Sequence, residues 1–376
     1  MVNKTRSKET KWSDRAIAHE DVWVIASFYK FFESPYREAN YEIFKRGIEA
    51  AGVRLAVVEI VAEGMDWTLR EEHDADKVLR LKTSSVLWHK ERSLNLMAEK
   101  LPATCKYIAW FDIDCSLEDN AWPQEAIEKL EVENYAAVQL CSNIEFEAKD
   151  GSIGESRLTY VRNVRRLGRD TMQAGGRVEG SPGFCWIMKQ KDFQNIGGLY
   201  DKAIIGGGDL LVADALCFNK TARLMLSNGD TANPYYQDYK RWKTNTIQKL
   251  QHKKPATYLS GNSRHLYHDE KQYRMYNVRH YLLLAEKYSP TLDLSREEKT
   301  GLWQLENQSI KDILQTYFWI REQPKSKDLD MIFRAFNAIS RHIKKYTDAE
   351  RAKELERKNS HQTFLPNHAT ETLSTS

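Results

Sequence analysis

The sequence lacks the long apolar run that a membrane span requires. Its longest apolar stretches, such as 53–62 with Arg54 and Glu59 inside it, are far shorter than the roughly 20 residues that cross a bilayer. Residues 1–20 are polar and mixed in charge, without the apolar core of a secretory signal. We therefore expect a cytoplasmic protein with no membrane span.

The sequence contains few cysteines, and its positive and negative charges nearly balance. The five cysteines stand singly, without CxxC pairs or the spacing of a metal finger, so we expect reduced thiols in the core. A net charge of +3 on 376 residues does not by itself indicate a nucleic-acid partner. One segment, Lys240–Lys287, is locally basic, with eleven Lys or Arg against three Asp or Glu and several interleaved aromatic residues. That segment is suited to an anionic partner.

An apolar run, Tyr107–Phe111, ends in two acids one residue apart, Asp112 and Asp114. A continuous apolar stretch of this length is typical of a strand buried on both faces of a sheet. The carboxyl ends of such strands are where open α/β sheets bind ligands, and residues i and i+2 of an extended segment point the same way. Both carboxylates could address one cation, although a solvated turn would also explain them.

The first sixty residues predict a βαβ unit. Strands are expected at 22–29 and 53–60, with a helix at 39–51 that ends at Gly52. Residues 63–82 are charged and aperiodic, which indicates a surface excursion, and 147–177 indicates a mobile loop with a short helix. From 296 onward the apolar spacing is helical. The expected fold class is therefore α/β.

Three further polar features could contribute to a site. Lys90, on a helix expected at 87–97, lies within reach of the strand tip in a doubly wound layout, although solvated lysines are common on helices. The turn 206–208 is all glycine and precedes Asp209, which is either a helix cap or a site acid. His265 and His268 are three residues apart and could converge on a cation, although such a pair is a weak signal alone.

Taken in order, these motifs resemble those of the GT-A glycosyltransferases, and in particular small bacterial and phage-type members related to family 2. The motifs that carry the resemblance are Leu87–Asn95, Ile108–Asp114, Val138–Gln139, Gly183–Trp186, Gly197–Gly198, Gly207–Asp209 and His265–His268. The resemblance implies a GT-A Rossmann-like nucleotide-sugar-binding fold with a mixed central sheet and a C-terminal helical extension. It also implies Mn or Mg as cofactor and a nucleotide sugar, with UDP-sugars favoured, as donor.

The resemblance also implies roles for individual residues. The donor would be bound by Ser27, Phe28, Tyr29, Glu59, Lys90, Asp112, Asp114 and Arg274, and the acceptor by Gly183, Trp186, Gly207 and Gly208. The metal would be held by Asp114, His268 and His265, and Asp209 would be the catalytic base. Gly208 stands where the family often has Glu, which leaves inverting and retaining chemistry both open. Asp269 stands where the family often has Gly after the histidine.

The implied organisation has four parts. Residues 1–20 form a polar leader, 21–290 the catalytic domain, 291–347 a helical extension and 348–376 a disordered tail. Within the catalytic domain, 21–141 is the nucleotide-sugar half and 142–290 the acceptor half. The oligomeric state is open.

Two other functions compete with this interpretation. A nucleotidyltransferase also combines a Rossmann-like half with metal-binding acids, but usually has a glycine-rich loop after its first strand, and Ser27–Phe32 contains no glycine. A nucleic-acid-binding protein without catalysis would use Lys240–Lys287, but would leave the two acids at the strand tip unexplained. The acceptor is expected to be a glycan or a hydroxylated DNA base.

Overall fold

The computed structural model describes residues 12, 16–31, 34–173, 179–219, 232–268, 271–276, 279–322, 330–343 and 345. Most of the polar leader and the whole of the predicted tail, 348–376, lie outside these residues. Within the described parts of the chain, no helix combines the length and apolarity needed to cross a bilayer. All five cysteines are buried and none forms a disulfide, as the sequence predicts.

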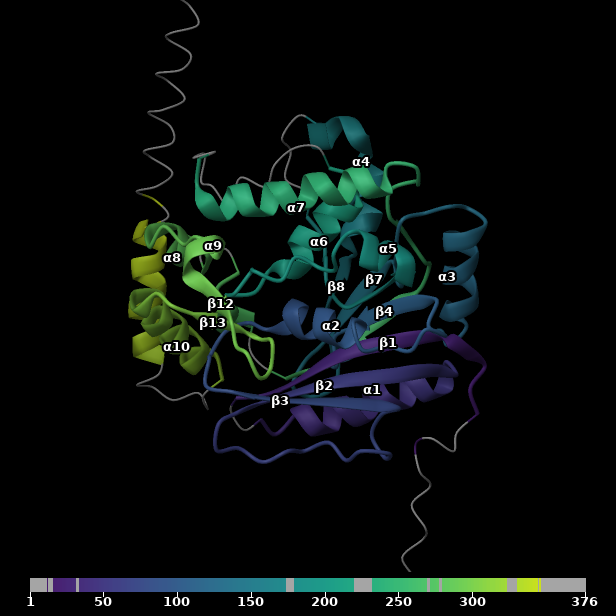
Figure 1. The fold of residues 1–376 in the computed structure, drawn as a ribbon, viewed down its shortest axis with the longest axis horizontal. Coiled ribbons are helices and arrows are strands. Elements are labelled where there is room, and N and C mark those ends of the chain that lie inside the picture. The colour runs from purple at the N-terminus through teal and green to yellow at the C-terminus, as the bar shows by residue number, and fades with distance from the viewer. Residues whose placement is uncertain are drawn as a thin grey trace, which may run out of the picture.

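A seven-stranded mixed sheet forms the centre of the molecule (Figure 1). Its order is β10 (Thr257–Tyr258), β6 (Val138–Gln139), β9 (Cys185–Lys189), β4 (Tyr107–Phe111), β1 (His19–Lys30), β2 (Val53–Ala62) and β3 (Lys77–Thr83). Strand β9 runs antiparallel to both of its neighbours, and the other pairs in this sheet are parallel. The α/β class and the mixed central sheet predicted from the sequence are therefore confirmed.

The alternation of side chains along β1 builds a separate core on each face of the sheet. Val24 and Phe28 belong to the core under α1 (Arg37–Ala50), whereas Trp23 and Ile25 belong to the core that contains α2 (Lys90–Ala98). Successive strand residues point to opposite faces, so a continuous apolar run requires cover on both sides. Figure 1 shows α1 below β1–β3 and α2 above them.

A second sheet extends the edge where β4 ends. Its order is β5 (Cys115–Leu117), β11 (Asn262–His265), β7 (Asn143–Glu147) and β8 (Ile153–Leu158). Strand β5 starts three residues after β4 and pairs antiparallel with β11, which places His265 opposite Cys115. This pairing brings a late segment of the chain to the predicted acids.

The remaining elements pack above and beside the sheets. They are α3 (Trp122–Glu131), α4 (Tyr160–Gln173), α5 (Gln190–Asn195), α6 (Gly208–Leu216), α7 (Pro234–Leu250), a 3-10 turn η3 (Lys271–Arg274), α8 (Arg279–Ala285), α9 (Pro290–Asp293), the antiparallel pair β12 (Leu294–Arg296) and β13 (Trp303–Leu305), and α10 (Gln308–Glu322). Helix α7 runs above α6, and α8 to α10 gather on one side of the molecule (Figure 1). Residues 330–343 are also helical.

Three expectations about local structure are wrong. The stretch 63–82 is not wholly a surface excursion, because its end forms the edge strand β3. The stretch 147–177 is not a loop with a short helix, because it contains β8 and the 14-residue α4, with 174–178 outside the described residues. The C-terminal part is not purely helical, because β12 and β13 pair within it.

Candidate active site

Asp112 is fixed at the tip of β4 by the neighbouring strand. Its amide donates to the carbonyl of Phe184 at 2.8 Å, and the amide of Phe184 donates to Asp112 Oδ2 at 3.1 Å. The Nζ of Lys90 forms an ion pair with Asp112 Oδ1. Burial disfavours the ammonium, but Asp112 outweighs that effect and raises the pKa of Lys90. Lys90 is therefore a cation held at the strand tip, as the sequence hypothesis requires.

Asp114 meets both histidines of the later segment. Its Oδ2 lies 2.8 Å from His268 Nε2 and 3.6 Å from His265 Nε2. The pairing of β5 with β11 explains the approach, and the amide of Leu266 donates to the carbonyl of Asp114 at 2.8 Å. Each of the three side chains offers one ligand atom, and these atoms lie within 4.8 Å of one another. The predicted metal residues are thus brought together.

The atoms of this triad fit a divalent cation. Asp114 Oδ1 is buried and, among the described residues, has no hydrogen-bond partner, which is a costly state for a carboxylate oxygen. Imidazole nitrogens with a carboxylate oxygen are a common ligand set for transition metals. Burial would raise the pKa of Asp114, but His265, His268 and Arg274 outweigh it and lower the pKa well below its usual range. The carboxylate is therefore ionised and available as a ligand.

Asp209 converges with Asp112 over Gly183. A Cβ on Gly183 would stand 2.8 Å from Asp209 Oδ2 and 3.3 Å from Asp112 Oδ2, so only glycine lets both carboxylates approach this face. Asp209 lies in the first turn of α6, and its Oδ1 accepts from the amide of Leu210 at 2.8 Å. The proposed base is therefore in the same site as the strand-tip acids, although nearly one hundred residues separate them in the sequence.

The glycines at 206–208 accommodate side chains of the chain itself. A Cβ on Gly207 would stand 2.7 Å from His280 Nε2, and Arg279 covers Gly206. Burial lowers the pKa of His280 to about 3, so the imidazole is neutral beside the Arg279 cation. The backbone at Gly206 and Gly207 is therefore covered by side chains of α8.

Two residues predicted to contact ligands lie in the core. Trp186 is 2% exposed, stacks on Trp110 with ring centroids 6.0 Å apart, and donates from Nε1 to the carbonyl of Pro182 at 2.9 Å. Phe28 is also buried and packs edge-on against Tyr41. Direct contact with a ligand does not fit this burial. Trp186 instead holds the turn that precedes Gly183.

The other predicted donor residues lie at the ends of β1 and β2. Ser27 Oγ lies 2.6 Å from Ser93 Oγ on α2, and Tyr29 stacks on Trp88 at 5.8 Å between ring centroids. Parallel pairing of β1 with β2 and β4 places these ends at the same edge of the sheet as Asp112. Arg274 NH2 lies 3.1 Å from His268 Nδ1, and so stands beside the metal triad.

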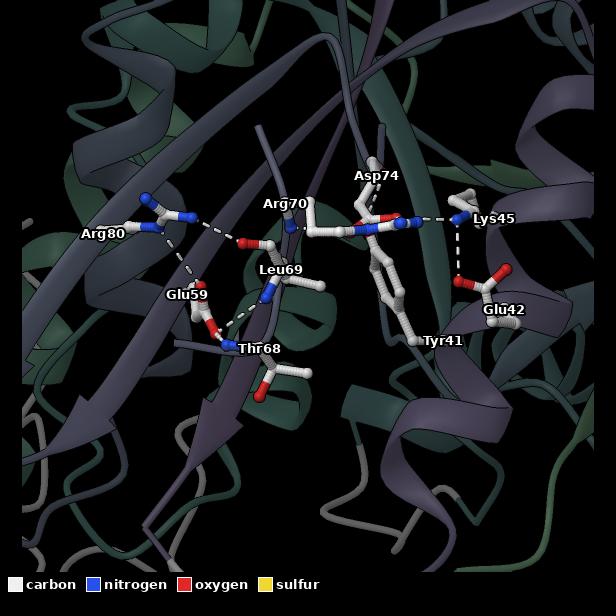
Figure 2. A network of polar contacts seen from close by, with 9 residues as sticks. All are labelled: Tyr41, Glu42, Lys45, Glu59, Thr68, Leu69, Arg70, Asp74 and Arg80. Carbon is white, nitrogen blue, oxygen red and sulfur yellow. Dashed lines mark hydrogen bonds and ion pairs between the residues drawn. The ribbon is translucent and has the colours of Figure 1, made fainter. Parts of the chain in front are cut away.

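Glu59 is fully buried at the end of β2 and holds a loop in place (Figure 2). Its Oε1 accepts from the amides of Thr68 at 2.5 Å and Leu69 at 3.2 Å, and its Oε2 lies 3.7 Å from Arg80 Nε. The ring of Trp67, in the same loop, lies 5.7 Å from the Arg80 guanidinium carbon and is more than one-third exposed. The sequence analysis predicts a surface segment here but does not single out Trp67, because the surrounding charged residues give no pattern that marks this ring.

A cavity of about 850 Å³ lies at the opposite edge of the sheet, where β1, β2 and β4 begin. Two ion pairs lie within its lining, Arg54 with Asp76 at 2.9 Å and Lys106 with Asp21 at 3.2 Å. This cavity is far along the strands from the acids, so we do not assign the chemistry to it.

No protein-family model matches the sequence, and no curated protein matches it. Among solved structures, the chain is similar to a mannosyltransferase from Pyrobaculum calidifontis in complex with GDP-Man and Mn²⁺, with 12% identity, 95% of this chain and 85% of that chain covered, and a TM-score of 0.38. It is also similar to the catalytic domain of Drosophila β1,4-galactosyltransferase 7, with 9% identity, 84% and 79% covered, and a TM-score of 0.31. A third structure, 4-diphosphocytidyl-2C-methyl-D-erythritol synthase from Anaerococcus prevotii, has 8% identity, 64% and 89% covered, and a TM-score of 0.28. At TM-scores this low, the likenesses do not decide between functions.

Proposed function

We propose that the chain is a metal-dependent glycosyltransferase that transfers a sugar from a nucleotide-diphosphate donor to an acceptor hydroxyl. One observation carries the proposal: Asp114, His265 and His268 converge beside the Asp112–Lys90 ion pair, with Asp209 entering the same site over Gly183. A cation site, a fixed ammonium and a separate carboxylate are the groups that diphosphate departure and hydroxyl attack require.

The residues divide the chemistry between them. Asp114, His265 and His268 would hold the divalent cation, Mn or Mg, which when bound supplies positive charge against the diphosphate leaving group. Lys90 supplies a second, fixed positive charge at the strand tip. Asp209 accepts the proton of the attacking hydroxyl, because a hydroxyl has too high a pKa to attack efficiently while protonated.

The donor lies along the carboxyl edge of β1, β2 and β4, with its diphosphate at Asp112 and Arg274 and its nucleoside toward Ser27 and Glu59. We favour UDP-sugars as donors. Residues 21–141 supply this donor side, and 142–290 supply Asp209 and the histidines. The acceptor is a hydroxyl of a glycan or of a hydroxylated DNA base.

The direct test is to incubate the protein with Mn²⁺ and a panel of UDP- and GDP-sugars, measuring released nucleotide and thermal shift. We expect at least one donor to be hydrolysed and to stabilise the fold only with metal. Asp114→Ala should lose both effects, whereas Asp119→Ala, which alters an exposed acid just beyond β5, should keep them. A wild-type protein that neither hydrolyses a donor nor is stabilised by one would refute the proposal.

The acceptor is tested separately, with hydroxymethylated duplex DNA and oligosaccharides as acceptors and with DNA binding measured against salt. Several of the eleven Lys and Arg residues in the basic segment 240–287 are not available to bind DNA. Lys243 is paired with Asp214 at 2.6 Å, Lys253 with Asp192 at 2.9 Å, and Arg279 is buried. Oligosaccharides are therefore the first acceptors to test.

A further inference from the structure

Phe184 lies between the acid at the tip of β4 and the metal triad, on the turn that leads into β9. Its carbonyl accepts from the amide of Asp112 at 2.8 Å, and its own amide donates to Asp112 Oδ2 at 3.1 Å. Its ring stands edge-on to the imidazole of His265, with ring centroids 5.3 Å apart and the two planes at 88°. One residue therefore contacts two groups of the site, one through its backbone and the other through its side chain.

The backbone of Phe184 has a conformation that favours glycine. Its φ is +79°, in the left-handed region, where a bulky side chain is strained. Strained residues persist where the surrounding structure fixes them, and they concentrate at functional sites. A glycine would adopt this φ without strain and could form the same two backbone hydrogen bonds with Asp112. The aromatic ring is therefore the part of Phe184 that needs a separate explanation.

Two phenyl rings pack against the imidazole of His265. The ring of Phe146 lies 5.1 Å from it between centroids, and the two residues are direct partners in the pairing of β7 with β11. Phe184 reaches the imidazole from the turn before β9, and the two phenyl rings meet edge-on at 6.0 Å. Edge-to-face contacts fix the relative orientation of aromatic rings. The second sheet and the segment that enters the central sheet thus both orient His265.

His268, the other histidine of the triad, is oriented by polar groups. Its Nε2 lies 2.8 Å from Asp114 Oδ2, and its Nδ1 lies 3.1 Å from Arg274 NH2. Among the described residues, its ring contacts that of His265 and neither phenyl ring. Groups that orient a ligating histidine commonly change metal affinity by about 10 to 100-fold when they are mutated. The phenyl ring of Phe184 should therefore affect metal affinity through one histidine and not the other.

We propose that Phe184 is a positioning residue of the metal site, which orients the imidazole of His265 with its ring while its backbone fixes Asp112. This inference rests on the metal site of the proposed glycosyltransferase. It requires that the ring of Phe184 acts on metal affinity through His265, and not through the stability of the fold. Binding of Mn²⁺ alone reports on it, without knowledge of the sugar or the acceptor.

The experiment titrates the full-length protein with Mn²⁺ and follows free Mn²⁺ by electron paramagnetic resonance. Phe184→Leu keeps an apolar side chain but removes the ring, and should raise the Kd for Mn²⁺ about tenfold. In the His268→Asn background, which retains His265, the same substitution should again raise the Kd about tenfold. In the His265→Asn background it should change the Kd by less than about twofold, because the imidazole that Phe184 orients is absent.

Phe193→Leu is the matched control for the loss of a buried ring. Phe193 is 2% exposed, packs against Trp110 and belongs to the core on the α2 face, whereas Phe184 packs against the core on the α1 face. This control should lower the melting temperature and leave the Kd for Mn²⁺ unchanged. A rise in Kd that matches that of Phe184→Leu would show that the loss of packing anywhere in the fold weakens the metal site, and would overturn the inference.

Three further outcomes would overturn the inference. They are an unchanged Kd in Phe184→Leu, an equal rise in both histidine backgrounds, and no binding of Mn²⁺ by the wild-type protein. The glycosyltransferase proposal fails separately. If Mn²⁺ binds with the expected pattern but no donor is bound or hydrolysed, that proposal is refuted and the role of Phe184 stands. If a donor is hydrolysed with Mn²⁺ while Phe184→Leu keeps the wild-type Kd, the reverse holds.

Discussion

Replacing Glu91 with Gln should stabilise the protein near neutral pH. Burial raises the pKa of Glu91, Lys90 lowers it and Asp209 raises it. The net effect moves this pKa from 4.5 to about 8. Below pH 4.5 the carboxyl group is protonated in both folded and unfolded chains and contributes nothing to the pH dependence. As the pH rises, the unfolded chain releases this proton while the folded chain retains it, so stability falls until the pH passes about 8.

The expected size of this effect follows from the linkage relation. Each pH unit inside the window lowers the free energy of unfolding by about 1.4 kcal/mol, so the loss from pH 5 to pH 7 is roughly 3 kcal/mol. Gln cannot ionise. The stability of Glu91→Gln relative to wild type should therefore grow by roughly that amount between the two pH values.

Urea unfolding at pH 5, 6 and 7, followed by circular dichroism, measures this difference directly. Glu125→Gln, on the exposed side of α3, is the matched control and should give the same difference from wild type at each pH. A difference for Glu91→Gln that is independent of pH, or that shrinks as the pH rises, would refute the reasoning, because Glu91 would then titrate no differently in the folded and unfolded chains.

Three other substitutions test the geometry. Gly183→Ala places a Cβ 2.8 Å from Asp209 Oδ2 and 3.3 Å from Asp112 Oδ2, and should lower donor hydrolysis at least tenfold in a steady-state assay with little change in the melting temperature. Asp209→Asn should lower kcat by about 10² or more, as loss of a general base does, while the thermal shift produced by donor and Mn²⁺ persists. Lys243→Met leaves the buried Asp214 without its ion-pair partner, and should lower the free energy of unfolding in urea by about 3 kcal/mol.

The strands of the first half could be predicted because their apolar patterns reflect burial on two faces. Val53–Ala62 is apolar almost throughout because both cores contact it, and Gly52 at φ +64° ends the preceding helix as expected. Lys77–Thr83 was missed because an edge strand alternates charged residues with apolar ones and resembles a surface segment. Local pattern therefore identifies central strands better than edge strands.

The site could be predicted only in part, because its geometry depends on pairings between distant segments. Asp112 and Asp114 were evident at the end of an apolar strand, but the arrival of His265 depends on the register of β5 with β11. Glu91 could not be singled out, because helical spacing assigns a charged residue beside Lys90 to solvent, whereas α2 buries Glu91 and its polar neighbours on all sides. A helix buried all round lacks the periodicity on which such reasoning relies.

Helix α2 links the acid at the tip of β4 to the helix that carries Asp209. Lys90 forms an ion pair with Asp112, and Glu91 lies over Gly208 at the start of the helix that carries Asp209. Because these two residues are adjacent on one helix turn, the docking of α2 helps to set the distance between the Asp112 ion pair and Asp209. Asn95 fixes that docking from the other end of the helix, where its amide group bonds both ways with Leu199. Residues are positioned most accurately when they stand on such packed elements.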